Sequence, residues 1–384
     1  MGHALPNSEG AALSSARYDV ARSIEALPPD SRATSRRAAL CPAHMQHRFE
    51  NVVLVGLTHV DAPVVISSRA IEDGIAETMQ RLGMPPGTIE QLTGIRERRF
   101  YEPGTAPSDA ARDAAERLLA VSPVPREDIG VIVSTSVCKD FIEPSVACLV
   151  HGGLGLSAGC LNFDVGSACL GFLNGMAIVG DMIERGLVRY GLIVDGEDSR
   201  YVVEQTVARL SQQGATSEDF SREFAALTLG SGAAAMLLGH RSLSPDAPRL
   251  TGGVFQAATQ HNRLCLGQPD RMLTDATGLL HAGVQLGQET FEQARQLLGW
   301  SRENLDVLAL HQVSRVHTRE LCARLHLPEE KAILTFPTLG NTGPAALPIA
   351  LSMALEQGRV PPGGRVALMG IGSGLNCGMF EVHW

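Results

Sequence analysis

Short runs of apolar residues alternate along the chain with longer segments whose apolar residues recur at helical spacing. The run at residues 51–57 is rich in β-branched side chains and predicts a strand. Strands that alternate with helices are typical of an α/β fold. The other runs predicted as buried strands are 131–135, 161–165, 191–195 and 233–238, and the predicted helices are 67–82, 108–119, 143–151 and 170–184.

The pattern of the first half of the chain recurs in the second. Residues 306–310 repeat the apolar pattern of 130–134, and residues 331–336 repeat that of 160–165. The Gly-Ser-Gly at 230–232 recurs at 372–374, where the offset has fallen by about 30. A polar helical insertion at 198–228 has the length that accounts for this fall. We therefore predict two matching halves, 48–240 and 250–384, and read residues 1–47 as a disordered N-terminal extension.

Composition narrows the classes of function. The chain of 384 residues has a net charge of −9, which disfavours nucleic acid as a partner. No apolar stretch approaches the roughly 18–20 residues that span a bilayer, and no secretory signal pattern stands at the N-terminus. Eight scattered cysteines form no CxxC pair, so we expect reduced thiols, no metal site and no cofactor in a cytoplasmic protein.

One cysteine has a setting that suits catalysis. The strand at 161–165 is followed by a Gly-Ser-Ala turn and a helix, so Cys169 is predicted at or next to the first helical turn. Unpaired backbone N–H groups and the helix dipole favour a thiolate there. The structural alternative is a small buried hydrophobic residue, which most free cysteines are.

Two residues of the second half complete a candidate set. At the offset of 172 between the halves, Asn341 corresponds to Cys169, and a pseudo-twofold arrangement makes the two helix starts face one site. His311 follows the predicted strand at 306–310. Taken singly, His311 is also consistent with a structural histidine and Asn341 with ordinary turn chemistry.

The motifs around these residues resemble those of the thiolase superfamily, and most closely the type III β-ketoacyl synthases. The resemblance rests on residues 165–169, 311–312, 340–342, 93–99 and 370–374 and covers about residues 50–384. Within that group the chain is most similar to the OleA branch, through residues 58–63, 140–145, 270–275, 311–315 and 372–377. The resemblance implies a five-layered αβαβα fold of duplicated halves, a homodimer, and head-to-head joining of two fatty acyl-CoA molecules in olefin biosynthesis.

Residue roles follow from this chemistry. A thiol holds the first acyl group, which assigns the nucleophile to Cys169. His311 and Asn341 have the donors that stabilise an enolate, and the backbone N–H groups of Cys169 and Gly374 are expected to form a second oxyanion hole. Non-decarboxylative condensation also needs a base for the α-proton. The resemblance implies that Glu143 is this base, supplied across the dimer interface, although a glutamate near a helix start is often ordinary.

Alternatives stay open at this stage. A decarboxylating β-ketoacyl-carrier-protein synthase III, a pyrone-forming ketosynthase that joins two carrier-bound chains, and an inactive thiolase-fold scaffold protein share most of these motifs. A carrier protein or downstream pathway enzymes are further expected partners. Thr342, where a more apolar residue is expected, departs from the pattern. The arginines expected to contact the CoA phosphates are Arg96, Arg98, Arg99 and Arg315, for which a solvated charged surface is the alternative.

Overall fold

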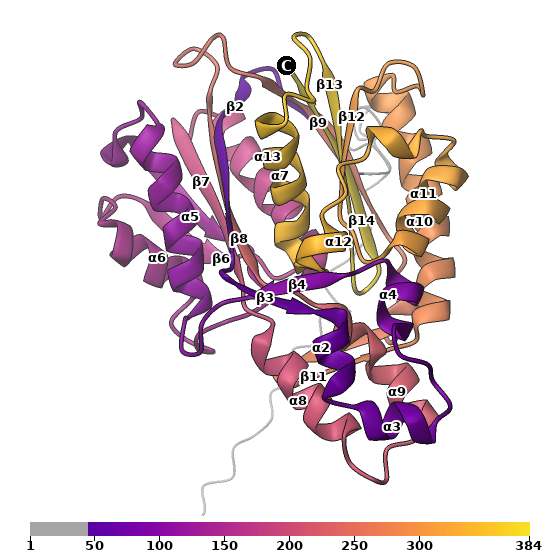
Figure 1. Cartoon of the computed structure of the whole chain (residues 1–384). Coiled ribbons are helices and arrows are strands. Elements are labelled where there is room, and N and C mark those ends of the chain that lie inside the picture. The colour runs from indigo at the N-terminus through magenta and orange to yellow at the C-terminus, as the bar shows by residue number, and fades with distance from the viewer. Residues whose placement is uncertain (1–44) are drawn as a thin grey trace, which may run out of the picture. The chain divides into compact units, whose positions relative to one another are not determined.

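A ten-stranded sheet forms the frame of residues 45–384, the part of the chain that the computed structural model describes (Figure 1). The strands follow the order β12-β13-β14-β9-β2-β8-β7-β5-β6, and β1 pairs with β9 off this path. β2 and β9 share a single pair, Val53 with Arg249, so the sheet divides there into two half-sheets. The strands are β1 (Gln46–Arg48), β2 (Val52–Asp61), β5 (Ile129–Ser134), β6 (Leu161–Asp164), β7 (Tyr190–Glu197), β8 (Gly232–His240), β9 (Arg249–Ala257), β12 (Val307–Leu310), β13 (Arg365–Gly372) and β14 (Asn376–His383).

The two half-sheets repeat one strand order. Outward from their junction the first half runs β2-β8-β7-β5 and the second runs β9-β14-β13-β12. In both halves the last two of these strands are parallel and the others antiparallel. The first half adds β6 at its edge, whereas the strand predicted at 331–336 is reduced to one bridge, Leu308 with Ala332. The duplicated architecture predicted from the sequence is confirmed, and this edge strand is the exception.

Helices lie in three layers around the half-sheets (Figure 1). α7 and α13 lie between the half-sheets, α5 and α6 cover the outer face of the first, and α10 and α11 cover that of the second. This is the predicted αβαβα arrangement. The helices are α2 (Ser68–Asp73), α3 (Ala76–Arg81), α4 (Thr88–Thr93), α5 (Pro107–Val121), α6 (Val146–Leu154), α7 (Gly171–Glu184), α8 (Arg200–Leu210), α9 (Ser217–Glu223), α10 (Ala276–Leu298), α11 (Arg315–Leu325), α12 (Phe336–Leu339) and α13 (Ala346–Glu356). Two small antiparallel sheets pair β3 (Val64–Ser67) with β4 (Glu97–Phe100) and β10 (Cys265–Gln268) with β11 (Arg271–Thr274).

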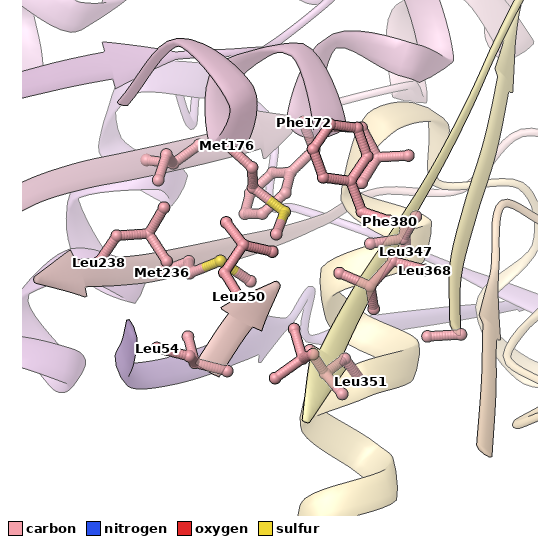
Figure 2. Packing of buried hydrophobic residues seen from close by; sticks show 14 of the residues in the cluster. Leu54, Phe172, Met176, Met236, Leu238, Leu250, Leu347, Leu351, Leu368 and Phe380 are labelled. Carbon is pink, nitrogen blue, oxygen red and sulfur yellow. The ribbon is translucent and has the colours of Figure 1, made fainter. Parts of the chain in front are cut away.

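The central layer is apolar because each of its helices packs against sheet on both sides. Phe172 and Met176 of α7 and Leu347 and Leu351 of α13 are buried in one cluster with strand residues of both halves (Figure 2). Each such side chain contributes about 1.5–3 kcal/mol when it is fully buried. A helix that is hydrophobic all round is stable only inside a protein. The turns that lead into α7 and α13 are therefore fixed deep between the half-sheets.

A separate apolar cluster lies outside these five layers. Residues 198–228, expected as an insertion, form α8, α9 and a 3-10 turn. They pack against α2–α4 through a core that includes Ile75, Phe100, Val203 and Phe220. The helix predicted at 67–82 is interrupted after Asp73, so it forms α2 and α3.

The predicted start of the helix at 143 is wrong. α6 begins at Val146, and Ser145 caps it by accepting a hydrogen bond from the Cys148 N–H at 3.1 Å. Serine supplies a cap that the preceding Glu143-Pro144 pair lacks. Glu143 therefore lies in the loop before the helix.

Two other boundaries differ from the sequence prediction. α5 begins at Pro107, one residue before the predicted start, and the Ser108 hydroxyl donates to the Asp140 carboxylate at 2.6 Å. Proline fits the first helical turn because its missing N–H is not needed there. At the N-terminal end, β1 places residues 46–47 in the sheet, so the expected extension at 1–47 is too long; its first 44 residues lie outside the described part of the chain.

Candidate active site

The turn that carries Cys169 joins β6 to α7. Cys169 lies in a 3-10 turn, Ala168–Leu170, which leads directly into the long central helix. Ala168 has φ +45°, a left-handed conformation that is uncommon for a residue with a Cβ and is often found at functional sites. The cysteine thus lies at the N-terminal end of α7, close to where the sequence predicted it.

Glycines of β13 allow this turn to approach the second half-sheet. A Cβ on Gly372 would lie 2.7 Å from the Ser167 carbonyl oxygen, and one on Gly370 would lie 3.0 Å from Leu170 Cδ1. Real Cβ atoms do not tolerate the first distance. Only glycine therefore fits at position 372 without moving the Cys169 turn.

The Asn341 turn is held by backbone and side-chain hydrogen bonds. The Asn341 N–H donates to the Thr228 carbonyl at 2.9 Å, and its carbonyl accepts from the Gly230 N–H at 2.9 Å. The side-chain Oδ1 accepts from the Gly343 N–H at 3.1 Å. Because this bond fixes the orientation of the amide, the Nδ2 hydrogens are left as donors for a ligand.

His311 lies directly after β12 and is 5% exposed. Its N–H donates to the Met369 carbonyl at 2.9 Å, which continues the β12–β13 ladder. The fully buried Gln312 accepts from the Thr335 N–H at 2.9 Å and donates to the Ile333 carbonyl. Gln312 therefore anchors the strand end, and His311 supplies the imidazole.

Three contacts bring these residues to one site. The 3-10 turns that precede α7 and α13 touch each other. The His311 ring lies close to the backbone of Gly343, two residues after Asn341. Gly370, which neighbours the Met369 partner of His311, lies against Leu170. The structure thus places Cys169, His311 and Asn341 at facing ends of the two halves.

The protein environment keeps Cys169 and His311 uncharged. Burial, followed by the charges of Cys265 and Glu197, raises the pKa of the Cys169 thiol to about 12, against a smaller opposing backbone hydrogen bond. Burial lowers the pKa of His311 to about 3. The sequence-based expectation of a readily formed thiolate is therefore wrong for the ligand-free protein: desolvation outweighs the helix terminus.

Two buried carboxyl groups adjoin the site and were not identified from the sequence. Glu197 accepts hydrogen bonds from the Val137 N–H at 2.6 Å and the Cys138 N–H at 3.3 Å. Asp195 accepts from the Thr135 hydroxyl. Burial, reinforced for Asp195 by the neighbouring Glu197 charge, raises the pKa of Asp195 well above its usual range, and burial raises that of Glu197 to about 7. The pair anchors the start of the loop that carries Glu143.

Glu143 itself is exposed. Its loop is tied down on both sides, by the Ser108–Asp140 bond and by Asp164, which accepts from the Ala147 N–H at 2.9 Å. Among the described residues Glu143 makes no hydrogen bond or ion pair, and its neighbours Phe141 and Ile142 are 59% and 100% exposed. Within one chain the structure does not join Glu143 to the three residues of the site.

The four arginines expected to contact phosphates have different environments. Arg98 is fully buried, donates to Ser68 and the Leu227 carbonyl, and has a pKa that burial lowers to about 10. The expectation of a phosphate contact is therefore corrected for this residue. Arg99 is half-buried beside Asp61 at 3.7 Å. Arg96 and Arg315 are exposed.

Residues 45–384 contain neither a candidate metal site nor a candidate membrane-spanning helix. In this range no group of three or more His, Cys, Asp or Glu side chains is placed to hold a metal ion. None of its helices is long and apolar enough to cross a bilayer.

Family models match two parts of the chain. Residues 163–251 match the model of 3-oxoacyl-[acyl-carrier-protein] synthase III, and residues 296–384 match the model of the C-terminal part of that enzyme. The first segment contains Cys169, and the second contains His311 and Asn341.

Relatives with assigned activities match nearly the full described chain. The acyl-CoA:acyl-CoA alkyltransferase of Xanthomonas campestris is 46% identical over 336 residues, which cover 88% of this chain and 99% of the relative. The enzyme of that name from Shewanella oneidensis is 35% identical, over 88% of this chain and 100% of the relative.

Solved structures give the same relation. Cerulenin-bound OleA from X. campestris has a TM-score of 0.87 and 46% identity, over 90% of this chain and 99% of that one. A cysteine-to-serine variant of the same OleA, with bound lauric acid and lauroyl-CoA, has a TM-score of 0.86 and 46% identity, over 88% of this chain and 100% of that one. The chain therefore belongs to the OleA family of acyl-CoA:acyl-CoA alkyltransferases, a branch of the type III ketosynthases with the thiolase fold.

Proposed function

We propose that this protein joins two fatty acyl-CoA molecules by a Claisen condensation without decarboxylation. The observation that carries the proposal is the convergence of Cys169, His311 and Asn341 at the facing turns of the two halves. Support comes from variants of the X. campestris relative that replace a glutamate, a cysteine and a histidine, spaced by 26 and 142 positions. Glu143, Cys169 and His311 have the same spacings.

The first half-reaction loads Cys169. Burial keeps the Cys169 thiol protonated, so it must lose its proton as it reacts with the acyl-CoA. The Cys169 sulfur forms a bond to the acyl carbon while the bond to the CoA sulfur breaks. The proton leaves with the CoA thiol. We assign the N–H groups of Cys169 and Gly374 to the oxyanion of this step; Gly374 follows Gly372, which adjoins the Cys169 turn.

The second half-reaction forms the carbon–carbon bond. Glu143 removes an α-proton from a second acyl-CoA, and donors on His311 and Asn341 stabilise the enolate oxygen. The α-carbon then attacks the Cys169 thioester, whose carbon–sulfur bond breaks. The departing Cys169 sulfur takes up one proton, which balances the proton that Glu143 removed. The products are a 2-alkyl-3-oxoacyl-CoA and the cysteine thiol, and no carbon dioxide is released.

Glu143 is proposed to serve the site of a partner subunit in a homodimer. Its loop exposes the apolar side chains of Phe141 and Ile142. Large apolar side chains that are exposed together on a surface often mark an interaction site. The anchors at Asp140, Asp164 and Glu197 hold the loop in place, so a partner would receive Glu143 from a fixed support.

Exposed cations are available for the CoA phosphates. A Cβ on Gly94 would lie 2.8 Å from Arg315 Nε, so the Arg315 side chain lies over the motif that contains Arg96. We propose these two arginines for phosphate contacts, in a cytoplasmic enzyme whose product passes to downstream enzymes.

The test is mass spectrometry of the products formed from lauroyl-CoA with no malonyl donor. We expect a 2-alkyl-3-oxo product, or the ketone that it gives after hydrolysis and loss of carbon dioxide. Glu143→Gln is expected to lose this product and keep an acylated Cys169, whereas the exposed control Glu127→Gln keeps both. Cys169→Ser should take up no thioester label, and the exposed control Cys148→Ser should label normally.

Three outcomes would redirect the proposal. An acylated Cys169 that gives product only after malonyl-carrier protein is added would favour the decarboxylating synthase. Product only from two carrier-bound chains would favour the pyrone-forming ketosynthase, and absence of any label on Cys169 would favour a scaffold protein.

A further inference from the structure

A small cavity lies behind His311, on the side of α10 and α11. Its volume is about 20 Å³, which is enough for one water molecule. Most of the wall is apolar. The cavity is lined by Gly283, Gly287, His311, His317, Leu321, Met369, Gly370, Ile371, Cys377 and Met379.

Both histidines at this cavity have a buried ring nitrogen without a partner. Nδ1 of His311 and Nδ1 of His317 are buried and make no hydrogen bond within residues 45–384. The other polar side chain of the wall is Cys377, whose thiol burial keeps protonated and which is a weak hydrogen-bond partner. A buried polar atom left unpaired costs free energy because its hydrogen bonds to water are lost. A polar molecule in this cavity would recover that cost for two atoms at once.

We propose that one buried water bridges Nδ1 of His317 and Nδ1 of His311, and that His317 is thereby a positioning residue for the condensation. The water donates one hydrogen to each nitrogen. Each neutral ring then carries its proton on Nε2. For His311 this is the nitrogen that must act as a donor toward the substrate oxygen, so the inference rests on the proposed function.

The electrostatic surroundings agree with this arrangement. Burial lowers the pKa of His317 to about 4, and burial together with His317 lowers that of His311. Both rings are thus neutral at neutral pH, so each has one N–H and one bare nitrogen whose identity is set by its partners. Without the water, nothing in the cavity distinguishes the two tautomers of His311.

A substitution at Gly283 tests the cavity without changing either histidine. A Cβ there would lie 3.8 Å from His317 Nε2 and 3.2 Å from Ile371 Cδ1, so Gly283→Ala adds a methyl group to the cavity wall at little steric cost. Gly152→Ala is the matched control, because this helical glycine has nothing within 4 Å of the added carbon. His317→Leu removes one partner of the water, and His317→Asn retains a polar group that can bind it.

Three measurements are made on the full-length protein. A high-resolution crystal structure is expected to show the water within hydrogen-bond distance of both Nδ1 atoms, and to show it displaced in Gly283→Ala. Nitrogen NMR of labelled histidine is expected to show the Nε2–H tautomer of His311 in the wild type and a mixture in His317→Leu. The kcat of condensation is expected to fall about tenfold in His317→Leu, less than the roughly 10²–10³-fold typical for loss of an oxyanion donor itself, with Cys169 acylation and KM unchanged and partial recovery in His317→Asn.

An empty cavity in the wild type at high resolution, an Nδ1–H tautomer of His311, or wild-type kcat in His317→Leu would each overturn the inference. The first two readouts do not need condensation activity. A wild-type protein that forms no product but holds the water and the tautomer would therefore contradict the proposed function alone.

Discussion

β7 and β13 occupy equivalent places in the two halves, yet they end in different residues. Thr135 donates its N–H to the Val194 carbonyl at 3.0 Å, and His311 makes the corresponding bond to Met369 at 2.9 Å. Counted onward from these bonds, Asp195 corresponds to Gly370 and Glu197 to Gly372. The first half thus places two carboxyl groups where the second half has no side chains.

Each strand end faces the turn that belongs to the opposite half. The Glu197 carboxyl carbon lies 3.7 Å from where a Cβ of Gly343 would be, beside the Asn341 turn. Gly372 lies against the Ser167 carbonyl in the Cys169 turn. The duplicated scaffold therefore supplies two similar helix starts. The glycines at the end of β13 let the Cys169 turn pack tightly, and the carboxyl groups at the end of β7 give the Asn341 turn polar surroundings.

The largest effect is expected at the amide donor. Asn341→Ala removes the Nδ2 hydrogens, and loss of one such donor typically costs 10²–10³-fold in kcat. We expect condensation of lauroyl-CoA to fall by that factor while Cys169 still takes up the acyl group, measured by intact-protein mass spectrometry. Loss of acylation together with condensation would instead show that Asn341 serves the first half-reaction.

The site residues that could be predicted from the sequence are those whose positions depend on the local pattern of residues. The strand, turn and helix around Cys169 follow from the switch of periodicity at residue 166, and the repeat of that pattern located Asn341. His311 was located at the end of a predicted strand, and Gly374 in the recurring Gly-Ser-Gly at 372–374. Their roles still came from the family resemblance, because one residue at a turn admits several structural explanations.

The residues missed from the sequence depend on distant neighbours. Asp195 and Glu197 extend an apolar strand, and only the fold brings Val137 and Cys138 to them. His317 fits no motif and gains meaning only from the cavity that it shares with His311. The start of α6 was misplaced because Ser145 and Glu143 both suit a helix start, and the hydrogen bond to Cys148 decides between them.

Gly372→Ala tests whether the end of β13 must lack a side chain beside the Cys169 turn. The new Cβ would lie 2.7 Å from the Ser167 oxygen, so either the Cys169 turn or β13 must move. Overpacking of this kind typically costs about 1–3 kcal/mol. We expect a lower free energy of unfolding in urea titrations and slower acylation of Cys169. Gly267→Ala is the control, since nothing lies within 4 Å of its added carbon; equal stability of the two variants would contradict the close approach.

The carboxyl side is tested by the pH dependence of Glu197→Gln. Because the pKa of Glu197 is raised to about 7, the native protein holds a proton that the unfolded chain releases between about pH 4.5 and 7. The native state is thus progressively destabilised as the pH rises through this window. Glutamine has no proton to lose, so its stability advantage over the wild type should grow with pH, by about 3 kcal/mol between pH 4 and pH 7.5.

The contribution of His311 and His317 to folding stability changes with pH in the opposite direction, so these two residues provide the control for that experiment. The pKa values of His311 and His317 are lowered, so their contribution to stability is lost as the pH falls from about 6.5 towards 4. His317→Leu should therefore gain on the wild type as the pH falls, whereas Glu197→Gln gains as it rises. Parallel profiles for the two variants would show that the pairs do not titrate as the structure implies.

The smallest effect is expected next to Asn341, at Thr342. This residue is 1% exposed, and its hydroxyl oxygen has no hydrogen-bond partner within the described chain. Valine has the same shape without the hydroxyl, and replacing an unpaired buried polar group by an apolar one is nearly neutral or stabilising. Thr342→Val should keep kcat within about twofold and leave the free energy of unfolding unchanged or raise it by up to about 1 kcal/mol. A tenfold loss of condensation with unchanged stability would instead mean that the hydroxyl contacts the substrate. The Asn341 turn would then contain two hydrogen-bond donors that act in the reaction.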